Sequence, residues 1–366
     1  MSNLSKYKPQ FTAGHHRYSV SNNYTITNYL KCDGSIVSQS VYPELYSQVG
    51  LIADNANISG IQWTARTSGT TSIIQTLTHG NSLYVYAGAG GILRTSTDAI
   101  TWTARTSGVT SLIYALTYGN GLYVYCASFN SVATSTDAIT WTQRTSGATE
   151  VILALTYGNG LYVYGANNGQ LGTSTDGITW TRRTTGTTQG ILALIYGNGL
   201  YVYGAAVGVL ATSTNAITWT ARTSGTGNSI LALTYGKGIY VYAGVGGVLG
   251  TSTDAITWTS RTSGTTSQIN SLTYGNGLYV YAGDGGVLRT STDAITWTAR
   301  TSGTTSTIQA LTTAALDGYV YAGVGGVLAT SPGPYTYNTS TEFALPQTIN
   351  NSITPGSLLT AHIKYR

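Results

Sequence analysis

Charge, cysteine and long apolar runs are all scarce in this sequence. Only 8% of its 366 residues are Asp, Glu, Lys or Arg, and it contains two cysteines. Gly, Thr, Ser and Asn interrupt every apolar stretch, so no segment reaches the length of a membrane-spanning helix. Residues 1–10 are polar and lack the apolar centre of a secretory signal. We therefore expect no insertion into a membrane and no secretory signal.

The two cysteines carry little information. Cys32 and Cys126 lie in different segments, so a disulfide is compatible with the sequence but not implied by it. Cys126 takes a repeat position that other copies fill with Ala87, Gly165 or Ala243, which favours a small buried residue.

The net charge of +5 is compatible with an acidic partner, but its distribution argues against nucleic acid. Seven of the 17 basic residues are arginines spaced 39 positions apart, from Arg66 to Arg300. Even spacing around a closed repeat spreads this charge instead of forming a basic stripe. Each of these arginines follows a tryptophan by three positions, so the two side chains face opposite sides of a strand. A cation–π contact between neighbouring repeats is favoured over a ring of ligand-binding arginines.

A 39-residue repeat organises most of the chain. All seven tryptophans belong to one series, and 46 glycines punctuate the sequence. The unit that starts at Trp102 contains four strand-like segments separated by turn residues, at 113–118, 122–127, 132–135 and 139–144. The i, i+3, i+4 spacing of helical repeats is absent. Four short strands in about 40 residues are typical of one β-propeller blade.

The two ends of the repeat region predict how the ring closes. Seven sets of three strands follow one another, but a fourth-strand segment at Trp63 precedes the first set. Pairing of this segment with residues 327–330 completes a seventh blade and removes the exposed edges of an open array. The expected fold class is all-β: a seven-bladed β-propeller of four-stranded blades over residues 59–334.

A turn precedes the tryptophan of most repeats and reads Ser-Thr-Asp-Ala-Ile-Thr-Trp at residues 96–102. It resembles the Asp-box of sialidase-like propellers, although it is one residue shorter and has Ala where Gly is usual, except at Gly177. A carboxylate can accept backbone N–H bonds inside a tight turn, and the tryptophan ring can cover that turn. We therefore interpret this column as structural rather than catalytic: Asp98, Asp137, Asp176, Asn215, Asp254 and Asp293.

The segments outside the repeat carry a second resemblance. Cys-Asp-Gly-Ser stands at residues 32–35 and is followed by Tyr-Pro-Glu-Leu at 42–45, while Thr-Glu-Phe-Ala-Leu-Pro stands at 341–346. These segments, in this order, resemble the bacteriophage tail-collar family. In that family the two halves lie close in sequence, whereas here the repeat region separates them.

The tail-collar resemblance implies a domain organisation and a biological context. Residues 1–58 and 335–366 are expected to form two parts of one small tail-collar-like domain into which the propeller is inserted. A closed propeller with adjacent chain ends is a suitable insertion unit. The resemblance also implies a location in the virion, other phage tail or baseplate proteins as partners, and a homo-oligomer, with a trimer expected from the family.

Catalytic and metal chemistry have little support in the sequence. A glycosidase needs two carboxylates facing one bond, whereas Glu150 and Asp284, the only acids on outward loops of one face, belong to blades three and six. His15 and His16 are adjacent, so on a strand they point to opposite faces and chelate one ion poorly. His79 occupies a position that other repeats fill with Tyr. We expect no catalytic residue, no metal site, no cofactor and no enzyme activity.

Variation among the near-identical repeats is concentrated at two places. One is the start of the first strand, and the other is the hairpin between the second and third strands. In a four-stranded meander both places lie on one face, opposite the Asp-containing turns. Exposed polar and aromatic loops on a rigid scaffold suit recognition. The candidate receptor-binding residues are Tyr114, Phe129, Asn167, Asn168, Asp284 and Glu150.

These observations favour a virion tail-fibre or baseplate-associated protein that contributes to host attachment by binding a bacterial surface glycan or another receptor. Two alternatives stay open at this point, a purely structural tail component and a hydrolase of envelope glycans. The chain is expected to enter and leave the propeller on the face of the Asp-containing turns, so the variable face is expected to point away from the tail-collar-like domain.

Overall fold

The computed structural model describes residues 62–128, 130–314 and 318–331, together with the backbone of five short strands nearer the chain ends. The contacts group residues 1–60 and 333–366 into one compact unit and residues 61–332 into another. The five short strands are β1 (His16–Ser19), β2 (Tyr29–Lys31), β3 (Ile36–Ser38), β32 (Glu342–Ala344) and β33 (Thr360–Lys364).

The smaller unit combines strands from both ends of the sequence. β33 pairs antiparallel with β1 and β2 in a three-stranded sheet, and β3 pairs antiparallel with β32. Val37 lies opposite Phe343 in the second pair. The Cys-Asp-Gly-Ser segment, Tyr-Pro-Glu-Leu and the residues 335–341 lie outside the described residues.

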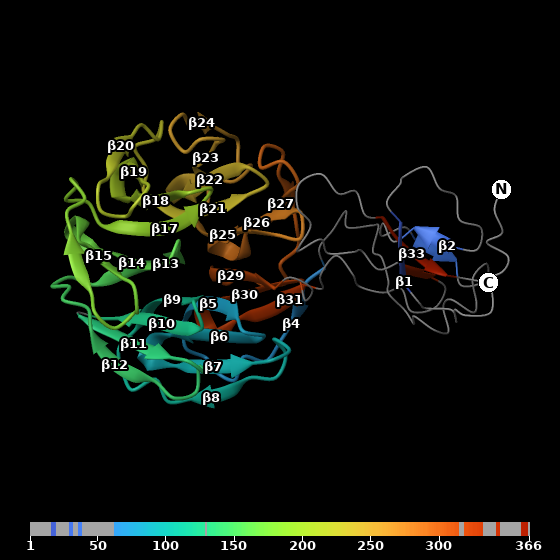
Figure 1. Cartoon of the computed structure of the whole chain (residues 1–366), viewed down its shortest axis with the longest axis horizontal. Helices are drawn as coiled ribbons and strands as arrows, with labels where there is room; N and C mark the ends of the chain where they lie inside the picture. The colour runs from blue at the N-terminus through green and yellow to red at the C-terminus, as the bar shows by residue number, and fades with distance from the viewer. Residues whose placement is uncertain are drawn as a thin grey trace. The chain divides into compact units, whose positions relative to one another are not determined.

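The larger unit is a seven-bladed β-propeller of four-stranded antiparallel blades, as the repeat predicts (Figure 1). The first four blades consist of β5 (Ile74–Gly80), β6 (Leu83–Gly88), β7 (Leu93–Ser96) and β8 (Thr103–Arg105); β9 (Ile113–Gly119), β10 (Leu122–Ala127), β11 (Ser131–Ser135) and β12 (Thr142–Thr145); β13 (Ile152–Gly158), β14 (Leu161–Ala166), β15 (Leu171–Ser174) and β16 (Thr181–Arg183); and β17 (Ile191–Gly197), β18 (Leu200–Ala205), β19 (Leu210–Ser213) and β20 (Thr220–Arg222).

The last three blades follow the same order. They consist of β21 (Ile230–Gly236), β22 (Ile239–Gly244), β23 (Leu249–Ser252) and β24 (Thr259–Ser260); β25 (Ile269–Gly275), β26 (Leu278–Gly283), β27 (Leu288–Ser291) and β28 (Thr298–Ala299); and β29 (Ile308–Ala314), β30 (Gly318–Gly323), β31 (Leu328–Ser331) and β4 (Thr64–Ala65). The first strand of each blade contacts the first strands of the neighbouring blades, so these strands surround the axis of the ring.

The fourth strand is shorter than the sequence predicts. The expected segment 139–144 starts at Ile139, whereas β12 starts at Thr142. The difference arises because the backbone N–H groups of Ile139 and Thr140 donate to the Asp137 carboxylate, 2.8 Å in each case, instead of joining a strand ladder. β12 therefore starts three residues later than predicted.

Tyrosines of the second strands join one blade to the next. Tyr123 and Tyr125 are fully buried, and their hydroxyl groups donate to the carbonyl oxygens of Gly80 and Ser107. Gly80 belongs to the preceding blade, and a Cβ atom at this position would lie 2.2 Å from the ring of Tyr118 in the next blade. Only glycine fits this close approach, which explains the glycine that ends the first strand of blades one to six.

The tryptophan and arginine columns have separate roles. Trp102 packs against Tyr86 of its own blade, with ring centroids 4.7 Å apart and the ring planes tilted by 44°. Arg105 donates from Nε to Oγ1 of Thr95 over 2.9 Å. The same contacts recur in other blades. The expected cation–π contact is therefore not the arrangement of the described residues, because the third strand of each blade offers the arginine a threonine hydroxyl as acceptor.

Two further predictions are confirmed, namely that Cys126 is a small buried residue and that His79 takes the place of a tyrosine. Cys126 is a fully buried free thiol, and burial raises its pKa. His79 stacks on Tyr84 at 4.4 Å, in the way that Tyr118 stacks on Tyr123 at 4.5 Å.

The predicted ring closure is also confirmed. β4 pairs with β31 through Ala65 and Thr64 opposite Ala329 and Thr330. The backbone N–H of Arg66 donates to Leu328 O over 2.8 Å, and Arg66 Nε donates to Thr330 Oγ1 over 2.8 Å. Strands from the two ends of the repeat region therefore complete blade seven.

Proline at Arg66 tests this closure. Arg66→Pro removes the N–H bond to Leu328 and the guanidinium bond to Thr330, and it frees a strand that no turn connects to its neighbour. The matched control is Arg261→Pro in blade five, which removes equivalent bonds of 2.8 Å and 2.9 Å within a covalently connected blade. We expect Arg66→Pro to lower the thermal unfolding midpoint much more than Arg261→Pro. Equal shifts in the two variants would show that β4 does not close the ring.

Candidate ligand-binding face and axial cavity

The Asp-containing turns use their carboxylates internally. Oδ1 of Asp98 accepts hydrogen bonds from the N–H groups of Thr101 and Ile100 and from the Ser96 hydroxyl, each 2.8 Å long. These donors, Thr101 first, lower the pKa of Asp98 to about 2. Asn215 Oδ1 accepts the same two backbone bonds at 2.9 Å. The same bonds recur at Asp137, Asp176, Asp254 and Asp293.

The hairpins between the second and third strands have a common backbone that restricts where side chains can vary. In six blades a short 3-10 turn occupies this place: η2 (Ala89–Gly91), η3 (Asn167–Gly169), η4 (Ala206–Gly208), η5 (Val245–Gly247), η6 (Asp284–Gly286) and η7 (Val324–Gly326). The third residue is always glycine, with φ of +70° at Gly91, and a Cβ there would lie 1.9 Å from Val109 O. Only the first two residues of each turn are therefore free to vary.

Each of these turns lies against the first strand of the next blade. The two variable places of the sequence consequently meet on one face. Asn168 Nδ2 donates to Glu150 Oε1 over 2.9 Å, and Asn270 Nδ2 donates to Asp284 Oδ1 over 3.0 Å. Four of the six candidate residues are thus hairpin or inter-blade residues of this face. Phe129 lies outside the described residues.

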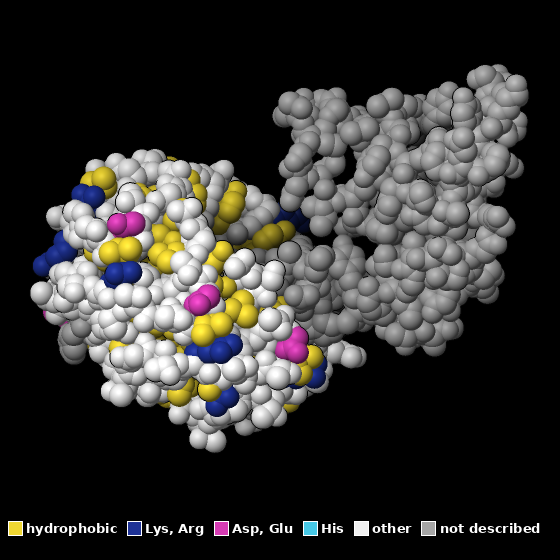
Figure 2. Space-filling view, turned by 60° about the horizontal axis from the view of Figure 1, so that its bottom comes forward, with side chains coloured by type: hydrophobic (Ala, Val, Ile, Leu, Met, Phe, Trp, Pro, Cys, Tyr) yellow, Lys and Arg dark blue, Asp and Glu magenta, His cyan; other side chains and the backbone are white. Residues whose placement is uncertain are grey.

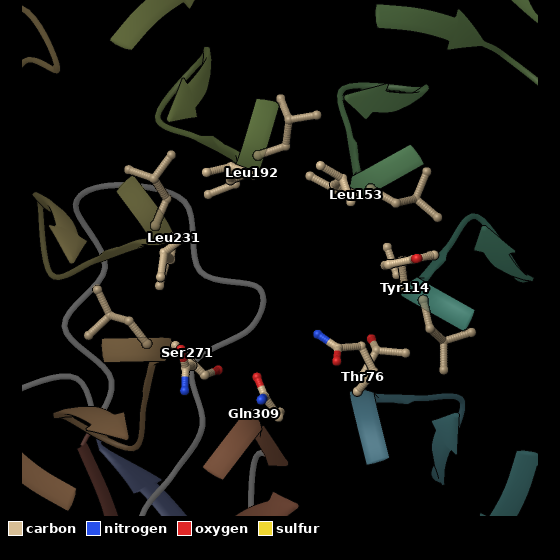
Figure 3. Close-up of a pocket in the computed structure, with 18 of the residues that line it drawn as sticks. Thr76, Tyr114, Leu153, Leu192, Leu231, Ser271 and Gln309 are labelled. Atoms are coloured by element: carbon tan, nitrogen blue, oxygen red, sulfur yellow. The ribbon is translucent and has the colours of Figure 1, made fainter. Parts of the chain in front are cut away.

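Tyr114 has a different position from the other candidates. It belongs to β9 and lines a cavity of about 310 Å³ on the propeller axis (Figure 3). The cavity wall comes from the first strands of all seven blades. One residue per blade, the second of each first strand, forms what we call the channel ring: Gln75, Tyr114, Leu153, Leu192, Leu231, Asn270 and Gln309.

The channel ring is divided into chemically distinct arcs. The leucine arc consists of Leu153, Leu192 and Leu231 in blades three to five, and the amide arc consists of Asn270, Gln309 and Gln75 in blades six, seven and one. Tyr114 lies between the two arcs. Figure 3 shows the polar ends of the side chains gathered on the side of Gln309 and Thr76, across the opening from Leu192.

Hydrogen bonding distinguishes the members of the amide arc. Asn270 is held on both sides, since its Oδ1 accepts from Gln268 Nε2 over 2.7 Å and its Nδ2 donates to Asp284 and to Ile308 O. Within the described part of the chain, the side chains of Gln75, Gln309 and Tyr114 make no hydrogen bond to another residue. The sequence analysis did not predict a leucine arc and an amide arc. The variation at the second residue of each first strand was the feature that indicated them.

Charged side chains lie away from the cavity in the part of the chain that the structure describes. Among the described residues, no Asp, Glu, Lys, Arg or His lines it, and no group of three or more His, Cys, Asp or Glu is close enough to hold a metal ion. Glu150 and Asp284 bond to different partners in different blades. The face in Figure 2 shows charged side chains in small patches separated by uncharged surface, with no continuous basic region. No helix in the described residues is long and apolar enough to cross a membrane.

Known structures share this propeller fold at low sequence identity. YCF48 from Cyanidioschyzon merolae is 16% identical, with a TM-score of 0.61 over 74% of this chain and 98% of that one. A catalytically inactive virginiamycin B lyase from Staphylococcus aureus with quinupristin is 12% identical, with a TM-score of 0.69 over 74% and 99%. The WD40 propeller domain of Doa1 is 10% identical, with a TM-score of 0.62 over 73% and 96%. No family model and no curated protein matches the chain. These similarities show the fold alone.

Two replacements of Asp176 distinguish the contribution of its hydrogen bonds to stability from the contribution of its charge. Asp176→Ala removes the acceptor for Ile178 and Thr179 and should lower the free energy of unfolding by about 1 kcal/mol. Asp176→Asn should keep most of this stability, because Asn215 already makes these bonds in blade four. The measurement is chemical denaturation, followed by linear extrapolation to water.

The same two proteins give a pH test. The N–H groups of Thr179 and Ile178 lower the pKa of Asp176 to about 2, below its unfolded value of about 3.9. The stabilisation is thus present above about pH 4 and is lost as the pH falls toward 2. Wild type should lose more stability than Asp176→Asn over this range. Parallel pH profiles would contradict the assignment.

Val207 is a valine in a conformation that favours Gly or Asn. Its φ is +49° and it is 59% exposed, whereas the equivalent position in blade three is Asn168 with a φ of +53°. We expect Val207→Asn to raise the free energy of unfolding by about 1 kcal/mol through relief of left-handed strain. The control is Val245→Asn in blade five. Val245 is the first residue of its hairpin and has no positive φ, so this change should leave the free energy of unfolding nearly unchanged. An equal effect of both changes on the denaturation midpoint would rule out strain as the cause.

Proposed function

We propose that this chain is a phage tail-fibre or baseplate-associated protein whose propeller contributes to host attachment by binding a bacterial surface glycan. The observation that carries the proposal is the concentration of side-chain variation in the second hairpins and at the start of the first strands, which lie on one face around the axial cavity. All blades share the same packing of Tyr, Trp and Gly, so packing alone gives no reason for Asn168, Val207 and Asp284 to differ. Exposed variation on a rigid scaffold suits recognition.

Strain at Val207 supports the same proposal. A β-branched residue in the left-handed region costs stability, and Gly or Asn at this place avoids that cost in other blades. An exposed side chain that is retained at a cost to stability is more readily explained by contact with a partner than by folding.

The strand pairing of the smaller unit supports the virion context. β3 directly follows the Cys-Asp-Gly-Ser segment, and β32 lies within Thr-Glu-Phe-Ala-Leu-Pro. The antiparallel pairing of these two strands is what one discontinuous tail-collar-like domain requires. With this context we also propose other tail or baseplate proteins as partners and a homotrimeric assembly.

The two alternative functions, a structural tail component and a glycan hydrolase, require different residues on the variable face. A purely structural tail component needs no variation on an exposed face. A retaining or inverting glycan hydrolase needs a pair of carboxylates at the substrate, and within the described residues Glu150 and Asp284 lie in blades three and six without a shared partner.

Substitution of the variable hairpins by residues from other blades tests attachment. The variant Asn167→Ala, Asn168→Gly and Asp284→Val uses side chains that occur at these positions in blades one and five, so the fold should be retained. We expect adsorption of phage carrying this variant to fall at least about tenfold, as for the loss of central contacts in an interface. Asp176→Asn, which alters the opposite turns, is the control and should adsorb normally. Normal adsorption of the folded triple variant would favour the structural rival.

A further inference from the structure

The channel ring departs from the sevenfold repetition of the blades in a way that core packing does not explain. All seven positions have the same backbone context, and leucine fills three consecutive ones. The amide arc carries Asn270, Gln309 and Gln75 at the same positions. The ring therefore has one apolar side and one hydrogen-bonding side in a scaffold that favours identical sides.

The polar side of the channel ring carries hydrogen-bond donors and acceptors that no described residue of the protein uses. Gln75 and Gln309 each carry an amide donor and a carbonyl acceptor, and the Tyr114 hydroxyl can act as either. Within the described residues, none of these three side chains has a hydrogen-bond partner in the protein. Asn270, by contrast, is oriented by Gln268 and Asp284 and forms a fixed polar edge.

The lining also defines the charge of a ligand. No described residue of the wall is acidic or basic, so a charged group that entered would lose water without gaining a counter-charge. The wall therefore suits an uncharged group better than an acidic sugar, a phosphate group or the charged end of a peptide. A volume of about 310 Å³ lies near the lower limit of small-molecule sites, about 300 to 1,000 Å³, which favours a small group.

We propose that the axial cavity binds one neutral sugar residue of a surface glycan. Its hydroxyl groups contact Gln75, Gln309 and Tyr114, and its C–H face lies toward the leucine arc. A pyranose ring matches the cavity because it combines several uncharged hydroxyl groups with an apolar face. This inference rests on the proposed function, and it names the class of glycan and the residues that select it.

The chain itself supplies the variant for the test. Gln75→Leu with Gln309→Leu extends the leucine arc into blades one and seven, with the side chain that blades three to five already accept. Full-chain protein is applied to an array of neutral oligosaccharides of glucose, galactose, rhamnose and N-acetylhexosamines, and of acidic oligosaccharides with uronic or sialic acid. We expect wild type to bind one or more neutral glycans. The double variant should bind them at least about tenfold more weakly, and Tyr114→Phe should weaken binding less.

Two controls make the result specific. Asp176→Asn should bind like wild type, and thermal unfolding should show that the double variant is folded. Binding of acidic glycans only, unchanged binding of neutral glycans by the double variant, or no glycan binding by wild type would each overturn the inference.

Host-cell binding by the same proteins separates this inference from the proposed function. If wild type binds cells and the hairpin variant does not, while Gln75→Leu with Gln309→Leu leaves glycan binding unchanged, attachment stands and the cavity assignment fails. If wild type does not bind host cells, the proposed function fails whatever the array shows.

Discussion

The antiparallel pair of β4 and β31 is the constraint on which the propeller depends. It joins Arg66 and Thr330, which are 264 positions apart, whereas every other fourth strand follows its third strand after a short turn. In each such contact a tyrosine hydroxyl group donates to a glycine carbonyl of the preceding blade. A blade therefore makes the full set of these bonds only when it has a neighbour on both sides. An open ring would leave two blades without such a neighbour and expose sheet edges. The hydrogen bonds of this short strand complete blade seven, and the packing of blade seven against blade one closes the ring.

Packing and turn chemistry together leave few positions where a side chain can change. Tyr–Gly contacts between blades tolerate no Cβ, and the third hairpin residue is held against the next inter-blade connection. The first two hairpin residues and the channel ring are among the positions that do vary, and both lie on one face. Side chains at these positions can change without altering the contacts between blades. For this reason the differences among the repeats carry the functional argument, and the repeated residues do not.

Charged groups in the propeller mostly satisfy local hydrogen bonds. The carboxylates close turns and the repeated guanidinium groups bond to threonines of the adjacent strand. The repeated arginines are evenly spaced along the blades, so their charge is spread around the ring and forms no concentrated patch that would attract a ligand over a long range. The face is therefore suited to a partner that is recognised at contact, by amides, hydroxyl groups and apolar surface, and the neutral wall of the cavity has the same character.

The sequence alone determined the number of blades, their four strands and the closure by the Trp63 segment, because a 39-residue period and the offset of its ends are one-dimensional properties. It also identified the turn role of the Asp column, since those hydrogen bonds join residues two and three positions apart. Only the tertiary structure decided which partner each Trp and Arg has, and that Gln75, Tyr114 and Gln309 face one cavity. These contacts depend on how the strands pack in three dimensions. Residues that are far apart in the sequence meet at the axis of the ring, and their separation in the sequence does not reveal this.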